Sequence, residues 1–154
     1  MSQTDRIEKR AVLRAPRSRV WRALTDAAEF GAWFGMKIDG TFEPGVSVLG
    51  RITTPGYEGV PVEMRIQAIQ PEKLFSYRWH PGVIEPPYDF ANEPTTLVEV
   101  RLADVEGGTG TLLTIVESGF DALPASRRAE AFRMNDGGWT EQIRNIERHV
   151  APPA

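Results

Sequence analysis

The chain has 154 residues, a net charge of -3 and 41% hydrophobic residues, which fits one globular domain built around one core. Its mixed charges argue against a nucleic-acid binder, which usually carries a basic face. The absence of cysteine excludes disulfides, thiolate zinc sites and a cysteine nucleophile. The sequence has neither an apolar run of membrane-spanning length nor a secretory signal, so a cytoplasmic location is expected.

The first part of the chain predicts a strand followed by two short helices. Residues 7–14 form the predicted strand, and Pro16 suits the first turn of a helix, where its missing N–H is not needed. Asp26 and Glu29 have the spacing of a capping box, which begins a second short helix. Gly35 can end that helix in the left-handed conformation.

The middle of the chain predicts five strands in succession, joined without helices. Val62, Met64, Ile66 and Ala68 alternate with polar residues, which is typical of a strand with one buried face. Strands that follow one another directly favour an antiparallel meander. The five predicted strands span residues 46–53, 60–69, 74–80, 95–103 and 110–118.

The last segment, residues 124–150, predicts one long helix that contains two glycines, Gly137 and Gly138. The hydrophobic spacing passes across both glycines without a slip, whereas a break would reset it. Burying five such side chains supplies on the order of 10 kcal/mol, against roughly 2 kcal/mol for two glycines in a helix. On the helical wheel Gly138 flanks the inner stripe and Gly137 faces away. Gly138 then lets a neighbouring backbone or ring approach the helix, or the pair marks a local bend.

Three stretches of the sequence, residues 15–35, 110–120 and 137–150, resemble the SRPBCC superfamily of START-like proteins. More narrowly, they resemble the branch named for the activator of the heat-shock-protein-ninety ATPase. The resemblance implies an α+β helix-grip fold, in which a curved six-stranded antiparallel sheet wraps around a long C-terminal helix and two short helices follow strand one. It also implies a single START-like domain over residues 1–154, with an ordered core of about 6–150.

The resemblance further implies a cavity between the sheet and the last helix. Arg128 and Asn135 lie on the inner stripe of that helix, where polar groups need partners or water. The proline-rich loop at 80–95 is long for a meander connection and can cover the cavity mouth. The candidate ligand-binding residues are Met64, Tyr77, Trp79, Phe90, Arg128, Phe132, Asn135 and Trp139. For each aromatic residue, simple packing in the core is the alternative.

The predicted function is binding of a small apolar or amphipathic molecule in this cavity. Arg128 is expected either to meet an anionic end of the ligand or to extend its charged head into solvent. An enzymatic alternative, a cyclase- or hydrolase-like reaction, would use Arg128, Tyr77 and Asp136. No sequence motif marks a catalytic residue, a metal site or a cofactor.

His80 and His149 are interpreted as solvated side chains rather than catalytic groups. Regulation of a heat-shock chaperone ATPase is a further alternative, although a chaperone partner is not expected from a chain without a second module. No nucleic-acid partner is expected, and a homodimer is left open.

Overall fold

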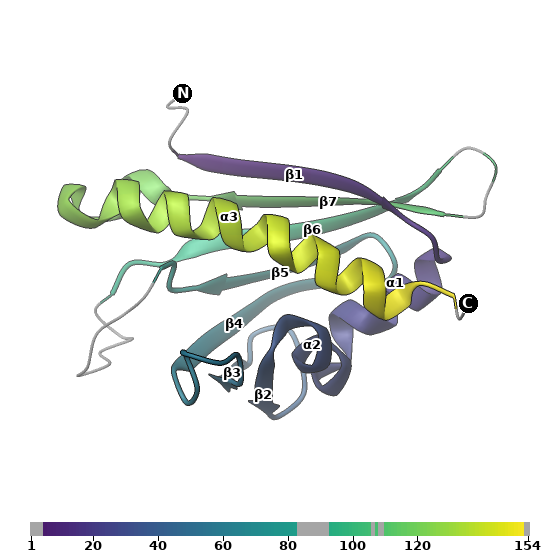
Figure 1. The fold of residues 1–154 in the computed structure, drawn as a ribbon, viewed down its shortest axis with the longest axis horizontal. Helices are drawn as coiled ribbons and strands as arrows, with labels where there is room; N and C mark the ends of the chain where they lie inside the picture. The colour runs from purple at the N-terminus through teal and green to yellow at the C-terminus, as the bar shows by residue number, and fades with distance from the viewer. Residues whose placement is uncertain (1–4, 83–92, 106, 108–109, 153–154) are drawn as a thin grey trace.

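The computed structural model describes residues 5–82, 93–105, 107 and 110–152. It shows a strand, two short helices, a run of strands and a long C-terminal helix, as the sequence predicts (Figure 1). The elements are β1 (Arg6–Leu13), α1 (Arg17–Thr25), α2 (Ala27–Phe34), β2 (Met36–Asp39), β3 (Ser47–Ile52), β4 (Pro61–Gln70), β5 (Leu74–Trp79), β6 (Thr96–Asp104), β7 (Thr111–Ser118), the 3-10 turn η1 (Phe120–Ala122) and α3 (Ala125–Val150).

Within the described residues, the strands form one antiparallel sheet of seven strands in the order β1-β7-β6-β5-β4-β3-β2. The first strand therefore pairs with the last one, and β2 forms the opposite edge. The predicted number of six strands is wrong because β2 was missed. This strand has only four residues and follows Gly35 directly, so its alternation is too short to identify from sequence. It pairs with β3 from Met36 opposite Ile52 to Asp39 opposite Leu49.

A bulge in β4 changes which residues face the core. The register between β4 and β5 shifts between Ile66 and Ala68. After the shift, Ile69 lies opposite Phe75 and packs against the core, while Ala68 lies opposite Ser76. The prediction that Ala68 continues the apolar face is therefore wrong, because a bulge adds one residue and reverses the alternation.

The helix α3 lies across one face of the sheet (Figure 1). It runs without interruption through Gly137 and Gly138, which confirms the prediction of a single helix. Both short helices are present, and α2 begins and ends as predicted: the Asp26 side chain accepts a hydrogen bond from the Glu29 backbone N–H at 3.0 Å, and Gly35 ends the helix with a φ of 94°. A positive φ at this position favours glycine.

A row of aromatic rings fills the space beneath α2. Phe30 contacts the rings of Phe42, Phe75 and Tyr77 at centroid distances of 5.5, 6.5 and 6.3 Å. Tyr77 in turn contacts Trp79 at 5.4 Å. We call Phe30, Phe42, Phe75 and Tyr77 the aromatic core; all four are buried.

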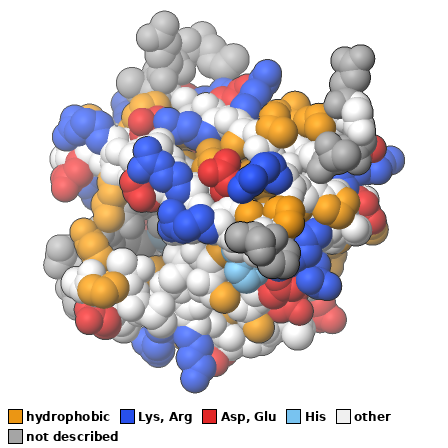
Figure 2. Space-filling view, turned by 45° about the vertical axis from the view of Figure 1, so that its right-hand side comes forward, with side chains coloured by type: hydrophobic (Ala, Val, Ile, Leu, Met, Phe, Trp, Pro, Cys, Tyr) orange, Lys and Arg blue, Asp and Glu red, His pale blue; other side chains and the backbone are white. Residues whose placement is uncertain are grey.

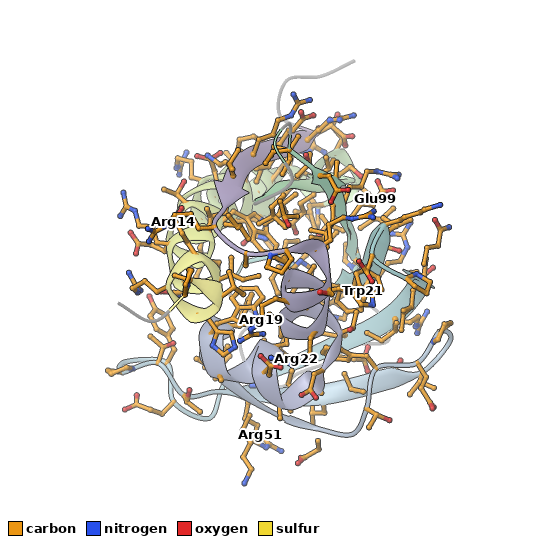
Figure 3. All side chains as sticks on the ribbon, turned by 90° about the vertical axis from the view of Figure 1, so that its right-hand side faces the viewer. Arg14, Arg19, Trp21, Arg22, Arg51 and Glu99 are labelled. Atoms are coloured by element: carbon orange, nitrogen blue, oxygen red, sulfur yellow. The ribbon has the colours of Figure 1, made fainter. Side chains whose placement is uncertain are left out.

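The three helices are joined by ion pairs around Glu29. Its carboxylate accepts hydrogen bonds from Arg19 at 2.7 Å, Arg22 at 2.7 Å and His149 at 2.9 Å, which brings α1, α2 and the end of α3 together. Figure 3 shows Arg19 between α1 and α3. Partial burial raises the pKa of Glu29, but the hydrogen bonds from His149, Arg19 and Arg22 outweigh it and hold the pKa below its ordinary value. The interpretation of His149 as simply solvated is therefore wrong.

The surface carries charges of both signs. Figure 2 shows basic and acidic side chains interspersed over the face in view, rather than the single-sign surface that a polyanion requires. Within the described part of the chain, none of the helices has the length and apolar character needed to cross a membrane.

Candidate functional site

A pocket of about 510 Å³ opens between the middle of α3 and the β3–β4 side of the sheet. Four parts of the chain line it: the end of α2 at Phe34, the β3–β4 hairpin between residues 52 and 63, the end of β5 between residues 79 and 82, and α3 between residues 134 and 142. This volume lies within the range of about 300–1,000 Å³ that is typical of small-molecule sites.

Two tryptophans form the wall at the bottom of the pocket. Trp79 from β5 and Trp139 from α3 stack at a centroid distance of 5.6 Å and an interplanar angle of 30°. Phe34 contacts both rings, at 5.7 and 6.3 Å. Tyr57 and Met134 also line the pocket, and both belong to the exposed large hydrophobic residues, at 50% and 41% exposure. The pocket therefore has an aromatic wall and an apolar rim.

A buried carboxylate, Glu117 of β7, lies behind this wall. The indole N–H groups of Trp79 and Trp139 each donate to it at 2.8 Å, one to each oxygen. The Asn135 amide nitrogen lies 2.9 and 3.0 Å from the two oxygens, and the Thr96 hydroxyl donates at 2.5 Å. Glu117 has no exposed surface. These four donors supply the hydrogen bonds that a buried carboxylate requires. We call Glu117 with its four donors the Glu117 cluster.

The Glu117 cluster fixes the orientation of the pocket wall. Both tryptophan rings are held by their N–H groups, and Asn135 is held at both ends because its Oδ1 accepts from the Gly82 backbone N–H at 3.1 Å. Glu117 is not among the residues that the sequence predicts for the site. The available signal was its phase: Glu117 continues the alternation of Leu113 and Ile115, so a carboxyl group was to be expected on the apolar face.

Tyr77 is a second buried polar side chain close to this cluster. Its hydroxyl is buried without a hydrogen-bond partner among the described residues. Burial and the nearby charge of Glu117 raise the pKa of Tyr77 well above its ordinary value. The phenol therefore stays neutral near neutral pH and does not act as a base.

Three of the eight predicted site residues lie together at the pocket. Trp79, Asn135 and Trp139 all line it, and all three belong to the Glu117 cluster. Met64 and Tyr77 are not among the lining residues, because both are completely buried in the core. The structure thus brings together the predicted residues near the middle of α3 and the end of β5.

The remaining three predicted residues lie elsewhere. Phe132 packs against Phe120 at 5.2 Å, away from the pocket lining. Arg128 donates to the carbonyl oxygens of Asp121 and Leu123, both at 3.0 Å, so its guanidinium lies at the start of α3 rather than in the pocket. The expectation that Arg128 meets an anionic ligand end has no support from this position. Phe90 falls outside the described residues.

Gly137 and Gly138 both line the pocket. A Cβ atom added to either glycine would meet no atom of the described residues within 4 Å. The predicted difference between an inward Gly138 and an outward Gly137 is therefore wrong, and Gly138 does not admit a neighbouring backbone or ring. The two glycines therefore leave α3 without side chains at these two positions of the pocket lining.

The groups suggested for acid–base chemistry do not share the pocket. Arg128 and Tyr77 lie outside the lining, and Asp136 forms an ion pair with Lys9 at 3.1 Å. His80 does line the pocket at the end of β5. The described residues include no group of three or more histidine, aspartate or glutamate side chains that could hold a metal ion.

Comparison with known proteins identifies a family. A family model described as "Activator of Hsp90 ATPase homolog 1-like protein" matches residues 14–151, which is most of the chain. The matched region includes both short helices, all of the pocket lining and α3 up to its last residue. No curated protein matches the chain.

Solved structures of similar fold come from several bacteria. A Mesorhizobium loti protein is 25% identical, with a TM-score of 0.72, over 94% of this chain and 96% of its own. An Arthrobacter aurescens protein is 17% identical, with a TM-score of 0.79, over 99% and 89%. The Aha1 dimer from Colwellia psychrerythraea is 14% identical, with a TM-score of 0.69, over 94% and 95%. These similarities confirm the helix-grip fold.

Proposed function

This chain belongs to the family of Activator of Hsp90 ATPase homolog 1-like proteins, and we propose that it binds a small apolar or amphipathic ligand in the pocket beneath the middle of α3. The observation that carries the proposal is a pocket of about 510 Å³ whose bottom wall is the stacked pair Trp79 and Trp139. Ligand sites typically combine such an apolar, concave surface with a few fixed polar groups.

The wall is held in place before any ligand arrives. The Glu117 cluster fixes both indole rings and Asn135, and the Gln142 amide donates to the Phe34 carbonyl oxygen at 2.8 Å. A wall fixed in this way loses little conformational freedom when a ligand binds, which favours affinity.

The glycine pair supports the same function. Each glycine in a helix interior costs about 1 kcal/mol relative to alanine. None of the described residues lies close enough to explain either glycine, since an added Cβ would have none of their atoms within 4 Å at both positions. The pocket accounts for their position, because larger side chains at 137 and 138 would project into the space that a ligand needs.

The proposal is tested with Nile red, a neutral apolar dye whose fluorescence rises on leaving water. We expect saturable binding to the wild-type protein, and Gly138→Leu is expected to weaken it about tenfold or more, which corresponds to about 1.4 kcal/mol. Thr140→Leu is the matched control, because Thr140 is exposed on the same helix and does not line the pocket. Equal binding by Gly138→Leu and wild type would place the dye elsewhere and reject this pocket as the site.

Two other functions follow from the family or the superfamily rather than from the pocket. Regulation of a heat-shock chaperone ATPase is the second candidate, favoured by the description of the matching family. Its test is the ATPase rate of a bacterial Hsp90 with and without this protein, and an unchanged rate rejects it. A cyclase- or hydrolase-like reaction through Arg128, Tyr77 and Asp136 lacks support, since none of the three lines the pocket.

A further inference from the structure

The Glu117 carboxylate has no cationic partner in the described part of the chain. Its hydrogen-bond partners are two indoles, a primary amide and a hydroxyl, all of which are neutral. Indole and amide N–H groups can only donate, so the carboxylate serves as the acceptor for each of them. In its ionised form Glu117 places a negative charge directly behind the aromatic wall of the pocket, balanced by dipoles rather than by a counter-ion.

This arrangement changes the character of the two indole rings. The face of a tryptophan ring attracts cations through its quadrupole, and tryptophan is the best of the aromatic side chains in this respect. An indole whose N–H donates to a carboxylate gains electron density in its ring. Both Trp79 and Trp139 donate to Glu117, so both rings of the wall attract a positively charged group in the pocket.

The remaining lining residues favour the same sign of charge. The charged residues among those described as lining the pocket are Glu63 and Glu141, and no lysine or arginine is found with them. The N–H groups of Trp79 and Trp139 already donate to Glu117, and the Gln142 amide donates to the Phe34 carbonyl oxygen. A carboxylate or phosphate ligand would lose its water and gain no lysine or arginine partner among the described lining residues, which is unfavourable.

We propose that the pocket selects molecules that carry a cationic end on an apolar body, best of all a tertiary or quaternary ammonium, over anionic ones. A quaternary ammonium needs no hydrogen-bond acceptor and suits an aromatic wall whose N–H groups are already used. This selectivity rests on the proposed function, because it assigns a ligand class to the same pocket. In this proposal the charged end of the ligand is cationic and is attracted by Glu117, whereas one of the two alternatives from the sequence is an anionic end that meets Arg128.

The test compares three amphiphiles that each carry a ten-carbon chain, used below their micellar concentrations: decyltrimethylammonium, decanol and decanoate. Affinities are measured at pH 7.5 by displacement of Nile red. We expect the ammonium compound to bind the wild-type protein about tenfold more tightly than decanoate, a typical gain for a desolvated cation on an aromatic face. In Glu117→Gln this preference is expected to fall to about threefold or less, while decanol binding stays nearly unchanged.

Glu99→Gln is the control for net charge. Glu99 lies on β6, on the side of the sheet away from the pocket (Figure 3), and pairs with Arg101 at 3.3 Å, so removing its charge should leave the preference intact. If Glu117→Gln fails to fold, Trp139→Phe takes its place, because it keeps a ring but removes one N–H to Glu117.

The outcomes separate the two proposals. If Nile red itself does not bind in the pocket, the proposed function fails together with the selectivity. If Nile red binds there but none of the three amphiphiles displaces it, the pocket is a ligand site and the cationic selectivity is wrong. If decanol binds but decanoate binds as tightly as the ammonium compound, the pocket is a ligand site and only the cationic selectivity is wrong. A preference that survives unchanged in folded Glu117→Gln would also reject the role of the buried carboxylate.

Discussion

The aromatic core beneath α2 and the pocket beneath α3 lie on the same face of one sheet, yet one is filled and the other is open. In the aromatic core, Phe30 contacts several rings and keeps only 1% of its surface exposed. At the pocket, α3 presents Gly137 and Gly138, where no atom in the described part of the chain lies within 4 Å of an added Cβ. The same row of rings connects the two regions, because Tyr77 contacts Trp79, which stacks on Trp139.

The two regions differ in the interactions that hold their side chains in place. Ring-on-ring packing completes the aromatic core, and it needs nothing beyond the chain itself. The pocket wall depends instead on hydrogen bonds to one buried carboxylate, and its outer side faces open space. Substitutions in the two regions should therefore differ in size and even in sign, and the following predictions measure this difference.

The largest effect is expected in the aromatic core, for Phe30→Ala. Removing a completely buried ring leaves a cavity, and we expect a loss of about 3–5 kcal/mol in the free energy of unfolding. Urea denaturation measures it, with Val12→Ala as a control on a side chain that is 55% exposed. A loss below about 1 kcal/mol would show that the core can collapse around the missing ring.

The second-largest loss of stability is expected at Glu117, behind the pocket wall. Replacing it by leucine leaves two indole N–H groups, an amide and a hydroxyl without their acceptor, and each buried unsatisfied group costs about 1–3 kcal/mol. Because leucine regains some packing, we expect a net loss of about 2–4 kcal/mol in unfolding free energy. Glu99→Leu, which removes a carboxylate from the other face of the sheet, should change stability far less. Equal losses would mean that the Glu117 cluster adds nothing specific.

A change of sign is expected at the glycines. Gly137→Ala and Gly138→Ala should each stabilise the protein by about 0.5–1 kcal/mol, because alanine favours the helix and its Cβ meets open space. Gly31→Ala in α2 is the contrasting variant, since its Cβ would collide with the carbonyl oxygen of Met36 and should destabilise the fold. Thermal denaturation measures all three. A destabilising Gly138→Ala would contradict the open surface of α3.

Much of the fold could be predicted because it rests on patterns within single segments. The unbroken hydrophobic spacing across Gly137 and Gly138 predicts one helix, and the Asp26–Glu29 pair predicts the start of α2. The four-residue strand β2 and the bulge in β4 were missed, since a short strand carries little alternation and a bulge reverses it without a sequence signal of its own.

The pocket was harder to predict because it depends on contacts between distant segments. Asn135 and Trp139 were chosen correctly as residues of the inner stripe, but their common partner, Glu117, comes from another element. Hydrophobic spacing places Met64 and Tyr77 on the same face as Trp79, and it cannot tell which of the three reaches the open space. The wheel could not decide between the two alternatives for Arg128, because it gives only the angle around the helix, whereas the backbone carbonyls of Asp121 and Leu123 determine where the guanidinium lies.

The smallest effect at neutral pH is expected for Tyr77→Phe, and its pH dependence gives it a distinct signature. The Tyr77 hydroxyl is buried without a described partner, so removing it should change stability by less than about 1 kcal/mol, and a gain is the expected direction. Burial and the charge of Glu117 raise the pKa of the folded-state phenol, so the unfolded chain ionises first, near pH 10. The stability difference between wild type and variant should therefore stay constant below pH 10, and above it wild type should lose up to about 1.4 kcal/mol relative to the variant for each further pH unit. Urea denaturation at pH 7.5 and at pH 11 measures the difference in unfolding free energy between wild type and Tyr77→Phe. If that difference is the same at both pH values, Tyr77 ionises as easily in the folded protein as in the unfolded chain.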